Sequence, residues 1–313
     1  MLNIYNTDLK TNKFEKIKEY KPGSWISLVN PTEEEIKEVC SNLKIEDEFI
    51  KYPLDYEEQA RIDVDDDMTL FVIDVPVMEE NDGQKTYATM PLGLIVVRDE
   101  YFISVSLRKN RIIDSFEKGR IKGMYTYKKT RFLLQILYLN ASYFLIDLKK
   151  INKEVENTVQ KLKESMKNKE LIQLLNLENS LVYITTSLKA NELVMEKTGR
   201  GKILKAYEED DEILEDAIIE NRQAMEMGKI YSDILSGTMD AYASIISNNL
   251  NVVMKLMTSI TLVLSVPTLI ASIWGMNVPL PFATNQNGFL IVVGISMIIS
   301  IVALVWLKKK DML

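Results

Sequence analysis

The feature that most constrains this chain is an uncharged stretch near its C-terminal end. Residues 256–307, 52 in all, include no Asp, Glu, Lys or Arg, although these four types make up 27% of the 313 residues. A buried helical hairpin of a soluble protein is the alternative, but such hairpins rarely run so far without a charge. We therefore interpret the stretch as membrane-embedded.

Two apolar runs fill most of this stretch. Each is about 20 residues long, the length that a helix rising ~1.5 Å per residue needs to cross a ~30 Å hydrocarbon layer. We predict transmembrane helices over 255–276 and 289–307. The segment between them, 277–288, contains Pro279 and Pro281, which break helices, and is predicted to be an outer loop.

Lysines at the ends of the two runs set the predicted orientation. Lys255 is the first residue of the first span, and a basic tail follows the second: Lys308, Lys309 and Lys310. Because basic residues are retained on the cytoplasmic side, we expect a plasma-membrane protein with both termini in the cytoplasm and lipid around its spans. The first residues form no apolar signal segment, which places the N-terminal part on the same side.

The first span has one polar face, which we call the polar stripe. It consists of Asn251, Met254, Thr258, Thr261, Ser265, Thr268 and Ser272. Intervals of three and four residues place such a set on one helix face. Hydroxyl groups are costly in hydrocarbon, so this face is expected to line a water-filled lumen, with helix packing through small polar residues as the alternative. Two helices cannot enclose a lumen, and a pore therefore requires several identical copies.

The polar face continues upstream into a predicted cytoplasmic helical stalk over 128–254. Its acidic members are Glu226, Asp233 and Asp240, whereas the opposite phases carry Leu214, Ile218, Met225, Leu235, Ile245 and Val252. One helix from about Glu208 to Trp274 would be on the order of 100 Å long at ~1.5 Å per residue. Residues seven apart are rotated by ~20° around a straight helix. The upstream acids therefore stay on the same face as the polar stripe only if the helices supercoil.

The first 127 residues have the pattern of an α/β domain, which we place in the cytoplasm. Segments 68–77, 92–97 and 101–107 are rich in β-branched and aromatic residues and are predicted to be strands. Helical patterns surround them. The predicted organisation is therefore an α/β domain over 1–127, the stalk, and a transmembrane hairpin with its basic tail over 255–313.

Composition excludes several classes of function. The chain has no His and a single Cys, Cys40, which excludes imidazole-based catalysis, His-ligated zinc sites and an intramolecular disulfide. The net charge of −7 disfavours nucleic acid and suits cations as ligands. No phosphate-binding motif of the type GxxxxGK followed by Ser or Thr occurs. We expect no enzymatic activity and no cofactor.

Three motifs carry a resemblance to a known family. Gly275, Met276 and Asn277, at the outer end of the first span, resemble the signature of the CorA family of divalent metal ion transporters. The preceding segment 247–258, SNNLNVVMKLMT, is similar to the part of that family that enters the membrane. Segment 25–35, WISLVNPTEEE, resembles the opening of the family's cytoplasmic domain, so the likeness spans nearly the whole chain.

The resemblance implies a homopentameric channel for passive, potential-driven influx of Mg²⁺, with Co²⁺ and Ni²⁺ as further candidate ions. It assigns Gly275, Met276 and Asn277 to the selectivity filter, where side-chain carbonyls of Asn277 would hold a hydrated ion through its waters. Met254 and Met257 lie near the predicted cytoplasmic mouth. They fit either an apolar constriction that closes by dewetting or ordinary packing.

The chain departs from the family pattern at two places. Residues 278–288 include no carboxylate, whereas family members often carry acids there. The resemblance also implies gating by a metal ion that bridges neighbouring subunits, and Asp216 matches the stalk acid of that site. Lys51 and Tyr52 occupy positions where its acidic partner is expected, which leaves Asp55 as a substitute. We therefore predict weaker feedback closure by cytoplasmic Mg²⁺.

Two alternatives remain open. Related zinc transporters share this architecture, but they typically carry Val at the position of Met276. A chain with no His and one Cys is also poorly suited to a soft metal. The second alternative is a membrane-anchored coiled-coil scaffold without transport, which would not need the polar stripe.

Overall fold

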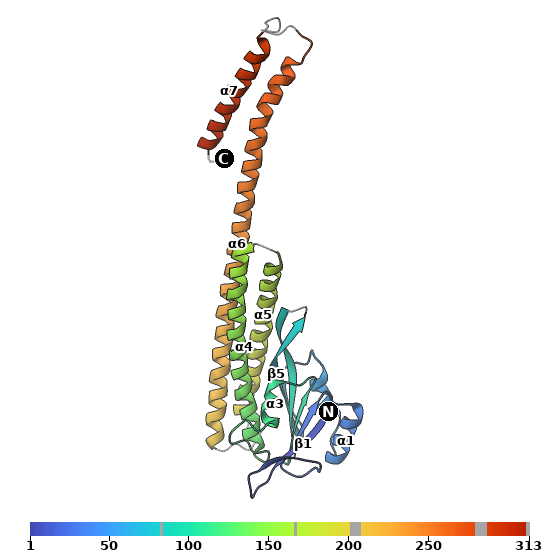
Figure 1. Ribbon diagram of the computed structural model, residues 1–313. Helices are drawn as coiled ribbons and strands as arrows, with labels where there is room; N and C mark the ends of the chain where they lie inside the picture. The colour runs from blue at the N-terminus through green and yellow to red at the C-terminus, as the bar shows by residue number, and fades with distance from the viewer. Residues whose placement is uncertain (82–83, 166–167, 201–207, 279–286, 311–313) are drawn as a thin grey trace. The chain divides into compact units, whose positions relative to one another are not determined.

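The computed structural model describes residues 1–81, 84–165, 168–200, 208–278 and 287–310 (Figure 1). The chain divides into two compact units. We call them the N-terminal unit, Met1–Ser236, and the hairpin unit, Gly237–Leu313.

The N-terminal unit is built on a seven-stranded sheet with the strand order β2-β1-β3-β7-β6-β5-β4. The strands are β1 Leu2–Thr7, β2 Phe14–Ile17, β3 Ser24–Val29, β4 Arg61–Val64, β5 Met68–Asn81, β6 Gln84–Val97 and β7 Tyr101–Ser106. Neighbouring strands are antiparallel except β3 and β7, which run parallel. The three predicted strands are confirmed, and β5 and β6 form a hairpin longer than the sequence pattern indicated.

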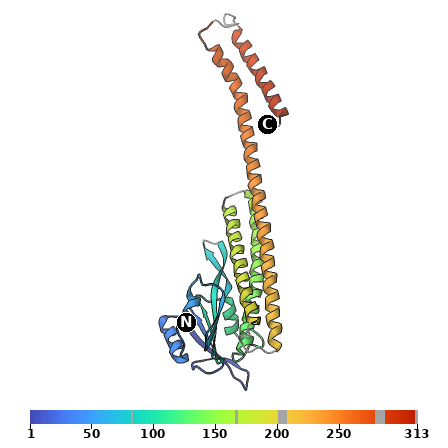
Figure 2. The ribbon, with the colours of Figure 1, turned by 180° about the vertical axis from the view of Figure 1, so that it is seen from behind.

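Helices cover both faces of this sheet (Figures 1 and 2). One face holds α1 Glu33–Leu43, α2 Glu48–Lys51 and the short 3-10 helix η1 Tyr52–Leu54, and the other holds α3 Arg111–Glu117, α4 Lys129–Ser165 and α5 Asn168–Arg200. Successive strand residues point to opposite faces. Trp25 therefore packs against Phe132, with ring centroids 5.1 Å apart, while Ile26 belongs to the core under α1. Both faces of the sheet are buried under helices, which confirms the predicted α/β architecture.

Helix α6 runs without interruption from Glu208 to Trp274, as the sequence predicted. Its first part packs beside α4 and α5 through small residues and through members of the expected apolar set: Leu214 and Ile218 pack against the core, and Leu235 is fully buried. Ala217, Ala224 and Gly228 are buried, and a Cβ atom on Gly228 would lie 2.6 Å from Cγ2 of Thr185. Asn221 lies in the same seam and donates through Nδ2 to the Leu188 carbonyl at 2.9 Å. Small side chains allow this close approach of the helices.

The hairpin unit consists of the remainder of α6 and of α7, Gly288–Lys309. Among the described residues, two helices are long and apolar enough to cross a membrane. Only 6% and 17% of the residues in their most apolar windows are buried, unlike the core helix of a soluble protein, so both predicted spans are present as helices. Helix α6 ends two residues before the predicted boundary at 276. The predicted outer loop falls mainly on 279–286, outside the described residues.

Candidate functional site

The polar stripe lies on the side of α6 that is turned away from α7. Residues facing the second helix are buried or half-buried: they are Ser259, Val263, Val266, Ile270 and Trp274. At about 100° per residue, the stripe is centred on the opposite side of the helix. Thr261, Ser265, Thr268 and Ser272 are all exposed in the protomer. The second span therefore leaves the stripe uncovered.

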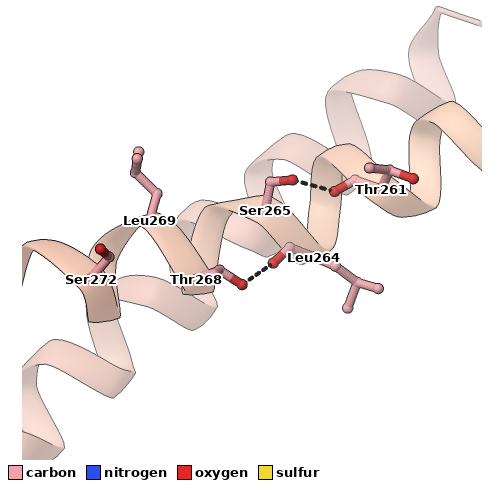
Figure 3. A pocket seen from close by; sticks show the side chains of 6 residues that line it. All are labelled: Thr261, Leu264, Ser265, Thr268, Leu269 and Ser272. Carbon is pink, nitrogen blue, oxygen red and sulfur yellow. Dashed lines mark hydrogen bonds between the residues drawn. The ribbon is translucent and has the colours of Figure 1, made fainter.

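Four of these residues line a shallow groove of about 500 Å³ together with two leucines. The lining residues are Thr261, Leu264, Ser265, Thr268, Leu269 and Ser272 (Figure 3). The groove runs along a single helix, and the protomer provides no opposite wall among its lining residues. A closed passage at this position therefore needs side chains from other copies of the chain.

The stripe hydroxyls donate to their own helix. Thr258 and Thr261 each donate to the carbonyl four residues earlier at 2.8 Å, and Ser265 does so at 2.7 Å. Thr268 donates to Leu264 at 3.0 Å. Figure 3 shows the last two of these bonds. The hydroxyls do not need water for their hydrogens, which weakens the sequence argument that they must face a lumen. Their oxygens retain lone pairs, so the stripe presents acceptors.

The Gly-Met-Asn motif follows directly after the end of α6. The Gly275 amide donates to the Ala271 carbonyl at 3.0 Å, and the Met276 amide to Ile273 at 3.2 Å, which tightens the last turn. The side chain of Asn277 is exposed and makes no hydrogen bond among the described residues. A methyl group on Gly275 would lie 3.4 Å from the Ala271 oxygen, an ordinary contact. The protomer alone therefore does not require glycine here.

Residues 21–309 match the family described as CorA-like Mg²⁺ transporter protein. This chain belongs to the CorA family. It is 28% identical over 298 residues to the cobalt/magnesium transport protein CorA of Methanocaldococcus jannaschii, covering 92% of this chain and 90% of the relative. A second CorA relative, from Thermotoga maritima, is 27% identical over 61% of this chain and 55% of its own length.

A solved structure has the same fold from end to end. The structure titled as the complete CorA magnesium transporter from Methanocaldococcus jannaschii aligns with a TM-score of 0.86 at 23% identity, and the alignment covers 100% of this chain and 99% of the other. The likeness includes both the sheet domain and the C-terminal helices. The two chains therefore share their fold over nearly their whole length.

The two acids predicted for a CorA-type regulatory metal are both exposed. Asp216 lies on α6, and Asp55 follows η1, where its carboxylate accepts the Glu57 amide at 3.0 Å. In the part of the chain that the structure describes, no three His, Cys, Asp or Glu side chains are grouped to hold a metal ion. Within one protomer, therefore, no complete regulatory metal site is formed.

Lys51 neutralises the acids that surround the predicted partner position. Its ammonium lies 2.7 Å from Asp47 and 3.6 Å from Glu33. The hydrogen bond from Lys51 lowers the pKa of Asp47. Tyr52 donates to Glu48 at 3.3 Å. These carboxylates are already partnered in the protomer, which disfavours their use as ligands for a bridging cation.

The predicted stalk acids are exposed and form no ion pair with another described residue: they are Glu226, Asp233 and Asp240. Glu226 lies about 200° around α6 from both Ala224 and Gly228, on the side turned away from the seam. These three acids are spaced seven residues apart. Continued along the sequence, the same spacing reaches Met254, whose side chain is 56% exposed, and then Gly275. Met257 is 62% exposed. Among the described residues, none covers either methionine.

A buried polar cluster under β5 was not predicted. Asn140 and Asn191 donate through Nδ2 to the Asp74 carbonyl at 2.8 Å, and Asn191 accepts from the Asp74 amide at 2.8 Å. Burial raises the pKa of the Asp74 carboxyl, and a hydrogen bond from Ser187 opposes that effect. The only sequence signal was a lone Asn on the apolar face of each long helix, which identified neither partner.

Proposed function

We propose that copies of this chain assemble around the polar stripe into a homo-oligomeric, expected homopentameric pore that admits divalent cations, chiefly Mg²⁺. The observation that carries the proposal is the uncovered row of hydroxyl acceptors on α6, in a chain of the CorA family. The relatives named above are described as cobalt/magnesium transport proteins. We propose Co²⁺ and Ni²⁺ as additional substrates.

A wall of acceptors suits a hydrated magnesium ion. Mg²⁺ sheds its water reluctantly, and its polarised waters donate hydrogen bonds outward. Asn277 side-chain carbonyls at the outer rim, with backbone carbonyls near Gly275, would accept from those waters. Neutral dipoles bind the ion weakly enough for it to leave. Further in, Thr268, Ser265 and Thr261 would offer hydroxyl oxygens along the path, and Met254 and Met257 would stand near the cytoplasmic mouth.

The membrane potential supplies the driving force. A divalent ion that moves through ~100 mV, inside negative, gains about 4.6 kcal/mol, twice the ~2.3 kcal/mol for a single charge. At ~1.4 kcal/mol per decade, this balances a roughly 2000-fold concentration ratio. Influx therefore needs no nucleotide. The proposed orientation is a plasma-membrane protein with both termini in the cytoplasm and the basic tail of Lys308, Lys309 and Lys310 on that side.

The test is ion uptake by purified protein in liposomes that contain a Mg²⁺ indicator, with equal Mg²⁺ on both sides. We expect a potassium diffusion potential, inside negative, to drive Mg²⁺ inward, and uptake to stop when the potential is collapsed. Uptake that persists at zero potential would refute the passive mechanism. Absence of any flux favours the scaffold alternative, and preferential uptake of Zn²⁺ in competition with Mg²⁺, Co²⁺ and Ni²⁺ favours the zinc alternative.

We also propose that internal Mg²⁺ closes this channel weakly. The support is the neutralisation of Asp47 and Glu33 by Lys51, together with the exposed positions of Asp55 and Asp216. Patch recordings with stepped internal Mg²⁺ test this. Strong closure that is lost in Asp216→Ala would contradict the proposal, because it would show that Asp216 still holds a regulatory ion.

A further inference from the structure

A second pocket lies in the N-terminal unit, away from the polar stripe and from the acids discussed above. It has a volume of about 290 Å³ and is bounded by the outer part of β5, the segment before α3 and the middle of α4. Its lining includes Pro76, Val77, Met78, Glu79, Arg108, Lys109, Asn110, Arg111, Asp147 and Lys150. The proposed transport pathway uses none of these residues.

The lining is cationic in an acidic chain. Four basic side chains, Arg108, Lys109, Arg111 and Lys150, face two carboxylates, Glu79 and Asp147, although the whole chain carries a net charge of −7. An excess of positive charge around a concave site concentrates anions there. The ligand expected from charge alone is an anion.

The basic side chains are held in place by the carboxylates. Asp147 is only 2% exposed and binds both Arg111 and Lys150, the latter at 3.0 Å. One carboxylate thus serves two cations and leaves positive charge uncompensated. Arg108 lies 2.6 Å from Glu79, and Lys109 lies 2.9 Å from Asp114, which also binds Lys118. Arg111 additionally stacks over Tyr143, with 4.7 Å from Cζ to the ring centroid.

Asn110 supplies an independent sign of a missing acceptor. Its side chain is 5% exposed, and its Oδ1 accepts the Ile113 amide at 2.8 Å as the N-cap of α3. This bond fixes the orientation of the amide group, so Nδ2 is the other atom. Nδ2 is buried and has no hydrogen-bond partner in the described part of the chain. An unsatisfied buried donor costs about 1–3 kcal/mol, which a bound acceptor would recover.

We propose that this pocket binds a phosphate group, either as inorganic phosphate or as the phosphate of a nucleoside monophosphate. Guanidinium groups match phosphate oxygens bidentately, and Asn110, another lining residue, carries the unpartnered Nδ2 donor. The volume lies at the small end of the ~300–1,000 Å³ typical of ligand pockets. It therefore suits a phosphoryl group with any attached nucleoside outside. The ligand would join β5, α3 and α4.

The experiment is calorimetric titration of the purified full-length protein in Mg²⁺-free buffer with inorganic phosphate, AMP and adenosine. Saturable binding is expected for inorganic phosphate, AMP or both, and none for adenosine. Binding of AMP alone assigns the site to a phosphate ester, and binding of inorganic phosphate assigns it to the free anion. No saturable binding by either would overturn the proposal. Because flux is not measured, this outcome is independent of the transport proposal.

Two substitutions test whether the phosphate group binds in this pocket. Asn110→Ser keeps a capping oxygen but removes Nδ2, and Arg108→Gln removes one guanidinium. Each is expected to weaken binding about tenfold, the equivalent of ~1.4 kcal/mol. Lys13→Gln is the matched control for charge, because Lys13 pairs with Glu15 at 3.1 Å on an exposed strand hairpin; we expect a change below twofold. Equal weakening by Lys13→Gln would show nonspecific attraction. If Asn110→Ser proves unstable in thermal melts, Arg108→Gln decides.

Discussion

The two units of this chain treat polar and apolar groups in opposite ways. In the N-terminal unit, large apolar side chains such as Trp25 and Phe132 are fully buried, and the buried carboxylate of Asp147 is paired with two cations. In the hairpin unit, Leu264 is 63% exposed and Phe289 is 77% exposed. There the hydroxyls bond to their own helix backbone. The N-terminal unit has the surface of a water-soluble domain, whereas the hairpin unit requires hydrocarbon and neighbouring copies.

This contrast separates what one protomer can do alone from what needs an assembly. Substitutions in the N-terminal unit should change the stability of the protomer, because its contacts are internal. Substitutions along the polar stripe and at its outer end should change transport with little effect on the protomer, because these side chains are exposed in it. Four predictions test this division.

The largest effect is expected at Asn277. Asn277→Ala removes a side-chain carbonyl that would accept from the ion's waters in every copy. Since one hydrogen bond to a charged group contributes about 1.5–3 kcal/mol, we expect Mg²⁺ flux to fall by about 100-fold or more. Light scattering after gel filtration should show an unchanged assembly. The matched control is Asn248→Ala, because Asn248 is an exposed asparagine on α6 that is not part of the polar stripe. Full flux in Asn277→Ala would remove the filter assignment.

A substitution at Gly228 tests whether changes within the N-terminal unit alter the stability of the protomer. A Cβ atom there would lie 2.6 Å from Cγ2 of Thr185, whose hydroxyl is held by the Leu181 carbonyl at 2.8 Å. Gly228→Ala should therefore lower stability by about 1–2 kcal/mol and Tm by several degrees, despite the better helix propensity of Ala.

Gly237 on the same helix is the control for this substitution, since no atom lies within 4 Å of the Cβ that Ala would add. Gly237→Ala should leave Tm unchanged or raise it slightly, because Ala favours helix by up to ~1 kcal/mol. Thermal melts in detergent compare the two variants. A large loss at Gly237 would show that another copy packs closely there, and equal stability of both variants would contradict the seam geometry.

Two serines with the same local bonding compare the stripe with α7, where Ser300 lines a groove with residues of α6. Ser265 donates to the Thr261 carbonyl at 2.7 Å on the stripe, and Ser300 donates to Ser296 at 2.9 Å on α7. Ser265→Ala should reduce flux about fivefold, the equivalent of one hydrogen bond of ~1 kcal/mol. Ser300→Ala should leave flux unchanged. Equal effects on liposome uptake would indicate that the stripe has no special contact with the ion.

The smallest effect is expected at Asp74, within the core of the N-terminal unit. Burial raises the pKa of its carboxyl, so the folded state binds the proton more tightly and becomes less stable as pH rises above the ordinary Asp pKa of ~3.9. Asp74→Asn should therefore match the parent near pH 4 and exceed it by about 1 kcal/mol near pH 7. Denaturant melts at both pH values measure this. Asp66→Asn, in an exposed turn, should show no such difference.

The elements that the sequence predicted best are those defined by composition over many residues. The uncharged stretch of 52 residues predicted both spans, and the upstream continuation of the polar face suggested the single helix that the structure shows from Glu208 to Trp274. The strands at β5, β6 and β7 followed from β-branched runs. Each of these signals is local, so no knowledge of distant contacts was needed.

The candidate site was predicted in its residues but not in its bonding. Three- and four-residue spacing placed Thr261, Ser265 and Thr268 on one face, yet only the structure shows that their hydroxyls are bonded to the helix and that α7 covers the opposite side. The phosphate pocket was missed altogether. Arg108, Lys109 and Arg111 are adjacent in sequence, but Asp147 and Lys150 come from a different helix.

Sequence by itself determined that this chain has two membrane-spanning helices, one polar helix face and the family signature at its outer end. These properties depend on residue type and on spacing along one helix, where geometry is regular. Tertiary structure decided which small residues form the α6 seam, which buried amides hold β5, and which cations surround Asn110. Those contacts join segments far apart in the chain, and only packing brings them within bonding distance.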